Sequence, residues 1–267
     1  MRGKTPLGIV GMVAAAAIAL TGCGDGGSAE PPGTTDYGSL AGLLKDVGAE
    51  LNDYWGTQWG TGWRNAVVKV PENAASTACG TIDAVEAGPA YCDADLTMVL
   101  PLAFFRDQLV GADDAGTNDA AVAAIVGHEF GHHLQALSGL SEEITAWQEE
   151  DPDNANLLSV ANELNADCTM GIWMSSVDDE RRLEPGDLAE VLIILGKIGD
   201  DQLSADAGEE ADATTFDHGT SEQRRVWFGV GYVEQDIEAC GRVFDDLADG
   251  TLAEELQAGA DAANARG

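Results

Sequence analysis

Positive charge is scarce in this sequence. Lysine and arginine together number 13, against 47 aspartates and glutamates, which gives a formal net charge of −34 over 267 residues. A surface this acidic repels polyanions, so nucleic acid is excluded as a partner. The same charge favours solubility and would repel anionic substrates.

Long apolar runs are also missing, except near the N-terminus. Arg2 and Lys4 precede an apolar stretch over residues 7–19, which is too short for a membrane span and is typical of a secretory signal peptide. The stretch ends in Leu20-Thr21-Gly22-Cys23, which resembles a bacterial lipobox and implies cleavage before Cys23 and lipidation of its thiol. A plain signal peptide with an incidental cysteine is the alternative. We expect a lipoprotein anchored in the cell membrane, on its extracytoplasmic side.

No internal repeat is evident, and the chain after the leader is long enough for one domain with a substantial core. We expect a signal peptide over residues 1–22, a flexible tether over 23–37 and one folded domain over 38–267. Helical patterns occur at 40–55, 119–137, 158–175, 188–198, 221–232 and 235–247, and β-like stretches at 66–70 and 96–100. These patterns predict a mainly helical α+β domain.

Cysteine is sparse, with five residues in the chain. If Cys23 is lipidated, the remaining four allow three disulfide pairings. We favour Cys79 with Cys92 across a hairpin-like loop, and Cys168 with Cys240 between distant helices. A reactive thiol at Cys168 is the alternative, but an exported protein favours oxidation.

Only four histidines are present, and two of them form the most informative pattern of the chain. His128-Glu129-Phe130-Gly131-His132 is an H-E-x-x-H motif within a predicted helix that Asn118 or Asp119 can cap and Gly139 can end. Residues four apart share one helix face, so both imidazoles can reach one metal ion. His133 lies about 100° further round the helix, and we interpret it as a packing residue, with a ligand role as the alternative.

A catalytic zinc site usually takes three protein ligands and one water. Downstream, Glu163 and Asp167 are four residues apart on a second predicted helix and therefore share a face. One carboxylate can bind the metal while the other accepts the remaining ring N–H of a ligand histidine. We expect the first role for Glu163 and the second for Asp167. A pair of solvated helix acids is the alternative.

These residues belong to longer runs that resemble the family of neutral zinc metallopeptidases. The runs are residues 128–135, 163–168 and 218–224 with Trp227-Phe228, and upstream 78–80, 88–92 and Phe104-Phe105. Asn165, Gly127 and Asp93 depart from the family's usual Gln, Ala and Pro, and none of them is a proposed ligand or base. These departures put substrate preference in doubt more than activity.

The resemblance implies a zinc-dependent peptidase with a zincin-like domain of gluzincin type, in which a second helix carries the third ligand. His128, His132 and Glu163 would hold Zn²⁺, and Glu129 would be the general base. His218 should face the site by the same resemblance. It would then donate a hydrogen bond to the oxyanion, replace Glu163 as a ligand, or have a structural role.

The expected mechanism is direct attack by a water that zinc activates and Glu129 deprotonates, with a peptide or protein as substrate. No pattern suggests a serine or cysteine nucleophile with its own base. Two alternatives remain, which are a non-catalytic lipoprotein that binds a cell-envelope partner on a peptidase-like scaffold, and a hydrolase of non-peptide amides.

Two further features carry weaker interpretations. Tyr54, Trp55, Trp59 and Trp63 could line a substrate cleft, although aromatic residues at such spacing are more often core. Acidic clusters at 149–153 and 206–210 are interpreted as solvated loops, without the regular oxygen spacing of a calcium site.

Overall fold

The computed structural model describes residues 39–85, 87–110 and 118–266. The expected signal peptide, Cys23 and the tether lie outside these residues. The strands are β1 (Val67–Lys69), β2 (Ala74–Thr77), β3 (Gly80–Asp83), β4 (Ala90–Cys92) and β5 (Thr97–Val99). The α-helices are α1 (Leu40–Trp59), α2 (Leu102–Phe105), α3 (Asp119–Ser138), α4 (Leu140–Glu150), α5 (Ala155–Asp179), α6 (Asp187–Lys197), α7 (Asp200–Ala207), α8 (Ser221–Glu234), α9 (Ile237–Cys240), α10 (Arg242–Asp249) and α11 (Thr251–Asn264). Short π- or 3-10-helical segments are η1 (Arg106–Val110), η2 (Pro152–Asn154) and η3 (Ala213–Thr215).

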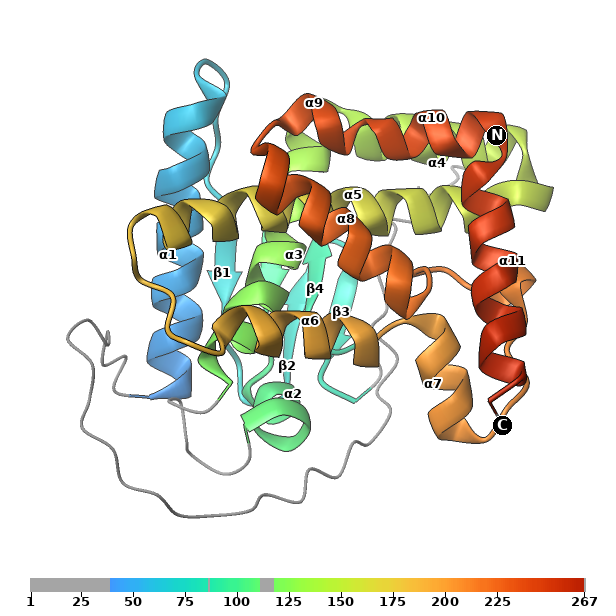
Figure 1. Ribbon diagram of the computed structural model, residues 1–267. Coiled ribbons are helices and arrows are strands. Elements are labelled where there is room, and N and C mark those ends of the chain that lie inside the picture. Colours follow the sequence, from blue (N-terminus) through green and yellow to red (C-terminus); the bar gives the residue numbers. More distant parts are fainter. Residues whose placement is uncertain (1–38, 86, 111–117, 267) are drawn as a thin grey trace, which may run out of the picture.

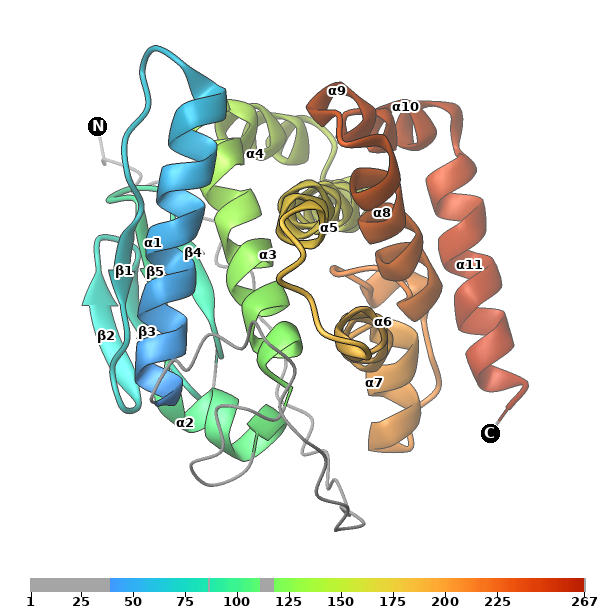
Figure 2. The same ribbon diagram turned by 60° about the vertical axis from the view of Figure 1, so that its left-hand side comes forward.

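The strands form a small mixed sheet and a hairpin. β5 is central in the sheet, parallel to β1 and antiparallel to β4, and β2 pairs with β3 in the hairpin. Figure 2 shows the strands on one side of the molecule, α8 and α11 on the other, and α3 and α5 between them. Figure 1 shows α5 and α8 running beside each other over α3. The domain is therefore mainly helical α+β, as the sequence predicted.

Most predicted elements are present, with corrections at their ends. The predicted helix 158–175 is longer, from Ala155 to Asp179, and the predicted helix 235–247 is divided into α9 and α10. Gln235 ends α8 in the left-handed conformation, with φ 53°, so the next helix cannot begin there. The first acidic cluster is partly helical, because Glu149 and Glu150 form the last residues of α4.

The starts of α8 and α3 are capped differently. Thr220 caps α8 through a reciprocal box with Gln223, as expected for a threonine at this position. Asn118 stands at the start of α3 but its side chain makes no capping hydrogen bond, and its Nδ2 donates to the Leu109 carbonyl at 3.0 Å. The predicted end of α3 is confirmed, since Gly139 adopts φ 87° there.

Small residues let α3, α5 and α8 approach closely. A Cβ atom on Gly131 would lie 2.7 Å from Ala166 Cα, and one on Gly231 would lie 1.8 Å from the Cys168 carbonyl oxygen. Contacts this short are forbidden to any larger residue without a shift of backbone. The glycines therefore set the spacing of the three helices that carry the candidate site.

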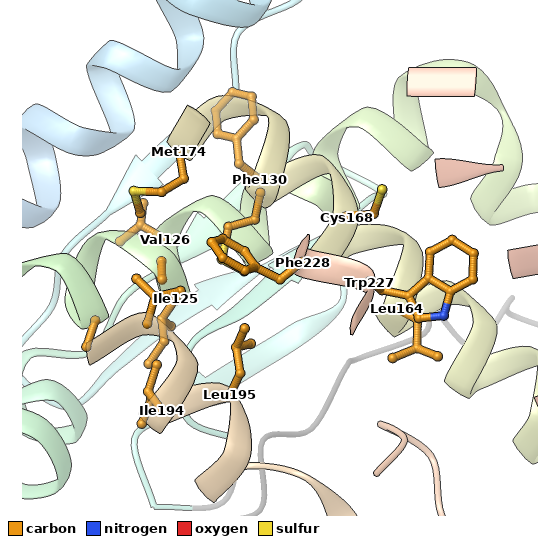
Figure 3. Packing of buried hydrophobic residues seen from close by; sticks show 14 of the residues in the cluster. Ile125, Val126, Phe130, Leu164, Cys168, Met174, Ile194, Leu195, Trp227 and Phe228 are labelled. Carbon is orange, nitrogen blue, oxygen red and sulfur yellow. The ribbon is translucent and has the colours of Figure 1, made fainter. Parts of the chain in front are cut away.

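The core fills the space around these helices. Figure 3 shows Phe130 and Val126 of α3, Leu164 and Met174 of α5, and Phe228 of α8 among the packed side chains. Phe130, Leu164 and Val126 are fully buried. This packing holds α3 and α5 in a fixed relation, because well-packed interiors resist displacement of one element against another.

The N-terminal aromatic residues belong largely to this core. Trp55 is buried, and Tyr54, Trp59 and Trp63 pack against the core cluster. The Trp63 ring stacks on Phe130. Packing is thus the better interpretation of this stretch than a substrate cleft. Among the described residues, no helix is both long and apolar enough to cross a membrane.

Candidate metal centre

The two histidines of the motif lie on one face of α3. His128 and His132 have ring centroids 4.9 Å apart, and Glu129 between them is 2% exposed. The helix forms here because alanine and other buried apolar residues precede the motif without a breaker. The structure therefore brings the two predicted imidazoles together inside the protein.

Glu163 reaches the same point from α5. Its Oε2 lies 3.0 Å from His128 Nε2, and its Oε1 lies 3.3 Å from His132 Nε2. The ligand atoms of these three residues all lie within 4.8 Å of one another. Glu163 is 5% exposed, which excludes the alternative of a solvated helix acid.

The outer nitrogens of both rings are occupied by acceptors. His128 Nδ1 lies 2.8 Å from Asp167 Oδ1, and His132 Nδ1 lies 2.9 Å from Gln135 Oε1. A carboxylate oxygen and an amide oxygen only accept, so each Nδ1 carries a proton. With Nδ1 protonated, each ring presents Nε2 to Glu163, so that Nε2 can donate to this carboxylate when protonated or bind a cation through its lone pair when the Nε2 proton is lost.

This arrangement fits a zinc ion. His132 Nε2 is buried and has no hydrogen-bond partner in the described residues, although Glu163 lies at ion-pair distance. Zinc bonds of about 2.0–2.1 Å in a tetrahedron would place neighbouring ligand atoms about 3.3 Å apart. The observed separations of 3.0 and 3.3 Å between nitrogen and oxygen are close to that value.

The charges of the three residues depend on one another. Burial on its own would lower the pKa of His128, but Asp167 and Glu163 outweigh it and raise that pKa to about 9. Burial would raise the pKa of Glu163, but the neighbouring imidazoles hold it well below its usual value. The cluster thus attracts positive charge, which protons or a cation can supply.

Glu129 occupies a different environment. Burial raises the pKa of its carboxyl, and the charges of His132 and His128 only partly offset that effect. A carboxylate that binds a proton more readily than usual is suited to take a proton and return it.

Arg224 is a functional residue that the sequence reasoning missed. It is 1% exposed, its Nε donates to Asp167 Oδ2 at 2.8 Å, and its Nη2 donates to Asp167 Oδ1 at 2.9 Å. Burial would raise the pKa of Asp167, but Arg224 and His128 lower it, so the carboxylate stays charged. The predicted role of Asp167 beside a ligand histidine matches this geometry, with Arg224 as its counter-ion.

His218 lies outside the group formed by His128, His132 and Glu163. Its Nδ1 is 3.2 Å from Asp200 Oδ1 and 2.6 Å from Asp217 Oδ1. Burial would lower its pKa, but these two carboxylates, with a further contribution from Glu163, raise it well above its usual value. His218 is therefore a buried imidazole whose surroundings favour its protonated form.

The loop that carries His218 is fixed by Asp200 at the start of α7. Asp200 Oδ2 accepts the backbone N–H groups of Asp217, His218 and Gly219 at 2.8–3.0 Å. Three such bonds to one carboxylate hold the loop rigidly. The sequence offered no signal for this contact.

His133 points away from the metal cluster, as its helical position predicts. Its Nε2 lies 2.8 Å from the Arg64 carbonyl, which only accepts, so its Nδ1 accepts the hydroxyl of Tyr91 at 2.8 Å. Burial lowers the pKa of His133 to about 4. It is a neutral packing residue between α3 and β4.

Two small pockets adjoin the cluster. His128, Glu129 and Arg224 contribute to an apolar pocket, whose other walls include Phe104, Ile125, Met170, Ile194, Leu195 and Ile198. His132 and Glu163 contribute to a polar pocket, whose other walls are Tyr91, Asp93, Gln135, Ser141 and Asn162. The surroundings of Glu129 are therefore mainly apolar, and those of Glu163 are more polar.

Both favoured disulfides are present. Cys79 pairs with Cys92, and Cys168 pairs with Cys240. The alternative of a reactive thiol at Cys168 is therefore wrong. The second bond joins α5 to α9 one residue after Asp167, and so supports the helix that carries Glu163.

The site agrees with what comparison with known proteins finds. Residues 33–243 match the family described as "Putative neutral zinc metallopeptidase". The "Uncharacterized protein YpfJ" of Escherichia coli (strain K12) is 35% identical over 198 residues, which are 72% of this chain and 67% of that protein. The "Uncharacterized protein Rv2575" of Mycobacterium tuberculosis (strain ATCC 25618 / H37Rv) is 32% identical over 174 residues, 61% of this chain and 57% of that protein. No solved structure matches the chain.

Proposed function

Because the chain belongs to the neutral zinc metallopeptidase family, we propose that it is a zinc-dependent peptidase of zincin-like type that hydrolyses peptide bonds. His128, His132 and Glu163 would hold the metal. One observation carries the proposal, which is that both Nδ1 atoms are bound by acceptors while both Nε2 atoms converge on Glu163. A packing role for these residues would not require that orientation.

The chemistry divides between the metal and the protein. A bound zinc ion would supply Lewis-acid activation of a water molecule and of the scissile carbonyl. Glu129 would take a proton from the attacking water and deliver it to the nitrogen of the leaving amine. Its raised pKa supports this role, because the carboxyl must hold the proton between the two transfers.

We assign two further roles to the surrounding cations. Protonated His218 would donate a hydrogen bond to the negatively charged oxygen that develops on the substrate. Arg224 would keep Asp167 charged and so keep His128 in the tautomer that leaves Nε2 free.

We also propose that the enzyme works at the extracytoplasmic face of the membrane, anchored by lipid on Cys23. The N-terminal pattern supports this location, and so do two disulfides, since such bonds persist in oxidising compartments. Metabolic labelling with a radioactive or clickable fatty acid tests the anchor. A Cys23→Ser variant should lose the label and leave the membrane fraction.

Metal content and peptide hydrolysis test the central proposal. The purified protein should contain about one zinc ion per chain and cleave members of a peptide library. Glu129→Gln should retain the zinc and lose cleavage by about 10²-fold or more, because general-base catalysis contributes on that order. Glu143→Gln is a matched control, since Glu143 is exposed on α4 and should change neither property.

The possible outcomes separate the competing functions. Zinc binding without cleavage of any peptide would favour the binding lipoprotein or a hydrolase of other amides. A protein that binds no zinc would overturn the proposal. His218→Ala should keep zinc and lower kcat by about 10²-fold, which distinguishes an oxyanion donor from a metal ligand.

A further inference from the structure

We infer that Gln135 is the positioning residue for His132, acting with Asn165 as a neutral amide relay between α3, α5 and α9. The relay consists of His132, Gln135, Asn165 and the Cys240 carbonyl. The inference rests on the proposed function, because it concerns how the zinc site is held.

The relay is a continuous chain of short hydrogen bonds. His132 Nδ1 lies 2.9 Å from Gln135 Oε1, and Gln135 Nε2 donates to Asn165 Oδ1 at 3.0 Å and to the Asn162 carbonyl at 2.8 Å. Asn165 Nδ2 donates to the Cys240 carbonyl at 3.0 Å. Gln135 is 2% exposed and Asn165 is 7% exposed, so water does not compete for these bonds.

The backbone acceptors fix the direction of every bond. The carbonyl of Cys240 can only accept, so the Nδ2 of Asn165 must face it and Oδ1 must face Gln135. The carbonyl of Asn162 likewise requires the Nε2 of Gln135. The Oε1 of Gln135 is therefore left for His132, and His132 Nδ1 must carry the proton. A flipped amide at Gln135 would place its oxygen against two acceptors.

The two ligand histidines are thus held by different chemistry. His128 is held by the charged pair of Asp167 and Arg224, whereas His132 is held by an uncharged amide. Glu129 and Glu163 already place two carboxyl groups at the cluster. A second carboxylate beside His132 would add more negative charge, while an amide orients the ring without changing the charge.

The far end of the relay is held by a covalent bond. Asn165 and Cys168 are three residues apart on α5, and Cys168 is bonded to Cys240, whose carbonyl accepts from Asn165. The disulfide therefore keeps the terminal acceptor against α5. The position of His132 depends in this way on a residue more than 100 positions further along the chain.

Metal affinity measured on four variants tests the relay. The purified protein is compared with Gln135→Ala, Asn165→Ala, the double variant and Gln148→Ala. The zinc dissociation constant is measured by competition with a chelator, and the absorption spectrum of the Co²⁺-substituted protein reports ligand geometry. Far-ultraviolet circular dichroism and the thermal unfolding midpoint report the fold.

Gln148 is a matched control. Its Nε2 also donates two hydrogen bonds, to the Ala155 carbonyl and to Ser159 Oγ at 3.0 Å each, and it joins α4 to α5 without contacting a histidine. Loss of this side chain should cost similar stability. It should leave the zinc dissociation constant within about twofold of the parent value, because partners that contact no ligand do not orient the metal site.

The relay predicts a specific pattern. Gln135→Ala should weaken zinc binding about 10- to 100-fold and shift the Co²⁺ spectrum, because loss of a partner that orients a ligand has effects of that size. Asn165→Ala should weaken binding less, by about threefold or more, and the double variant should match Gln135→Ala, since residues in one network are not additive. Asn165→Ala carries the test if Gln135→Ala does not fold.

Other results would overturn the inference. If Gln135→Ala has the zinc affinity and the Co²⁺ spectrum of the parent protein, His132 does not need the relay to hold its position. Equal losses in Gln148→Ala would show a general effect of stability. A parent protein that binds neither metal would overturn the proposed function as well, whereas the first two results would leave it standing.

Discussion

Arg224 of α8 donates two buried hydrogen bonds to the carboxylate of Asp167 of α5, and this carboxylate also accepts a hydrogen bond from His128. Removal of the cation would leave an uncompensated carboxylate in the interior. Such a loss costs about 3–5 kcal/mol.

We therefore expect Arg224→Ala to lower the free energy of unfolding by about 3–5 kcal/mol and to weaken zinc binding. Denaturant titration and chelator competition measure the two effects. Arg225→Ala is the control, because Arg225 is the next residue and donates to the Leu192 carbonyl. Similar losses in both variants would contradict a special role for the buried pair.

Gly231 provides a second prediction. A Cβ atom there would lie 1.8 Å from the Cys168 carbonyl oxygen, and backbone cannot yield cheaply at that distance. Gly231→Ala should destabilise the fold by about 1–3 kcal/mol or more, as overpacking does. Gly229→Ala lies on the same helix with nothing within 4 Å, and should be neutral or stabilising by up to about 1 kcal/mol. The thermal unfolding midpoints of both variants test this prediction. Equal midpoints would contradict the close approach of α8 to α5 at Gly231.

Glu190 on α6 gives a pH-dependent prediction. Partial burial, followed by the charges of Asp187, Asp119 and Glu184, raises the pKa of its carboxyl from 4.5 to about 7. The folded protein then binds the proton more tightly than the unfolded chain does. The free energy of unfolding must fall as pH rises through this interval, because the unfolded state gives up its proton first.

Glu190→Gln should therefore unfold at a higher temperature than the parent at pH 8, and the difference should disappear near pH 4. Glu255→Gln is the control, because Glu255 is exposed on α11. An increase in unfolding temperature for Glu190→Gln that is the same at pH 4 and pH 8 would contradict the titration of Glu190 in this interval.

Removal of the metal should leave the fold in place. The core holds α3 and α5, the Cys168–Cys240 disulfide joins α5 to α9, and the imidazoles of the site pair with Glu163 without an ion. Chelation should therefore abolish peptide cleavage while the circular dichroism spectrum is preserved. The unfolding free energy should fall by about 2.7 kcal/mol relative to protein in zinc at 100 times its Kd. Unfolding of the chain on chelation would contradict this expectation.

The centre of the site was predictable because it depends on helical spacing. His128 with His132, and Glu163 with Asp167, are each four residues apart, and this spacing alone places each pair on one face. Gln135 was within reach of the same reasoning, since it lies three residues after His132 on α3. Its role is not evident from the sequence, because a glutamine side chain has no characteristic metal chemistry.

Arg224 and Asp200 could not be found in this way. Arg224 meets Asp167 from 57 residues away, and Asp200 meets the His218 loop through backbone groups that every residue has. The break between α8 and α9 was missed for a related reason, because the left-handed turn at Gln235 is not encoded by a glycine. The first two depend on contacts between separate elements, whereas periodicity describes only one helix at a time.

The Cys240 carbonyl at the end of the relay also sets an order of assembly. The groups that support the two imidazoles include Arg224, which lies 96 residues after His128, and Cys240, which lies more than 100 residues after His132. During synthesis the metal motif emerges long before its supports, so α3 cannot hold its rings in place until nearly the whole domain has been made. Zinc should then bind tightly only to the fully synthesised and oxidised chain. A chain that is truncated before Cys240, or that lacks the Cys168–Cys240 bond, should bind zinc less tightly.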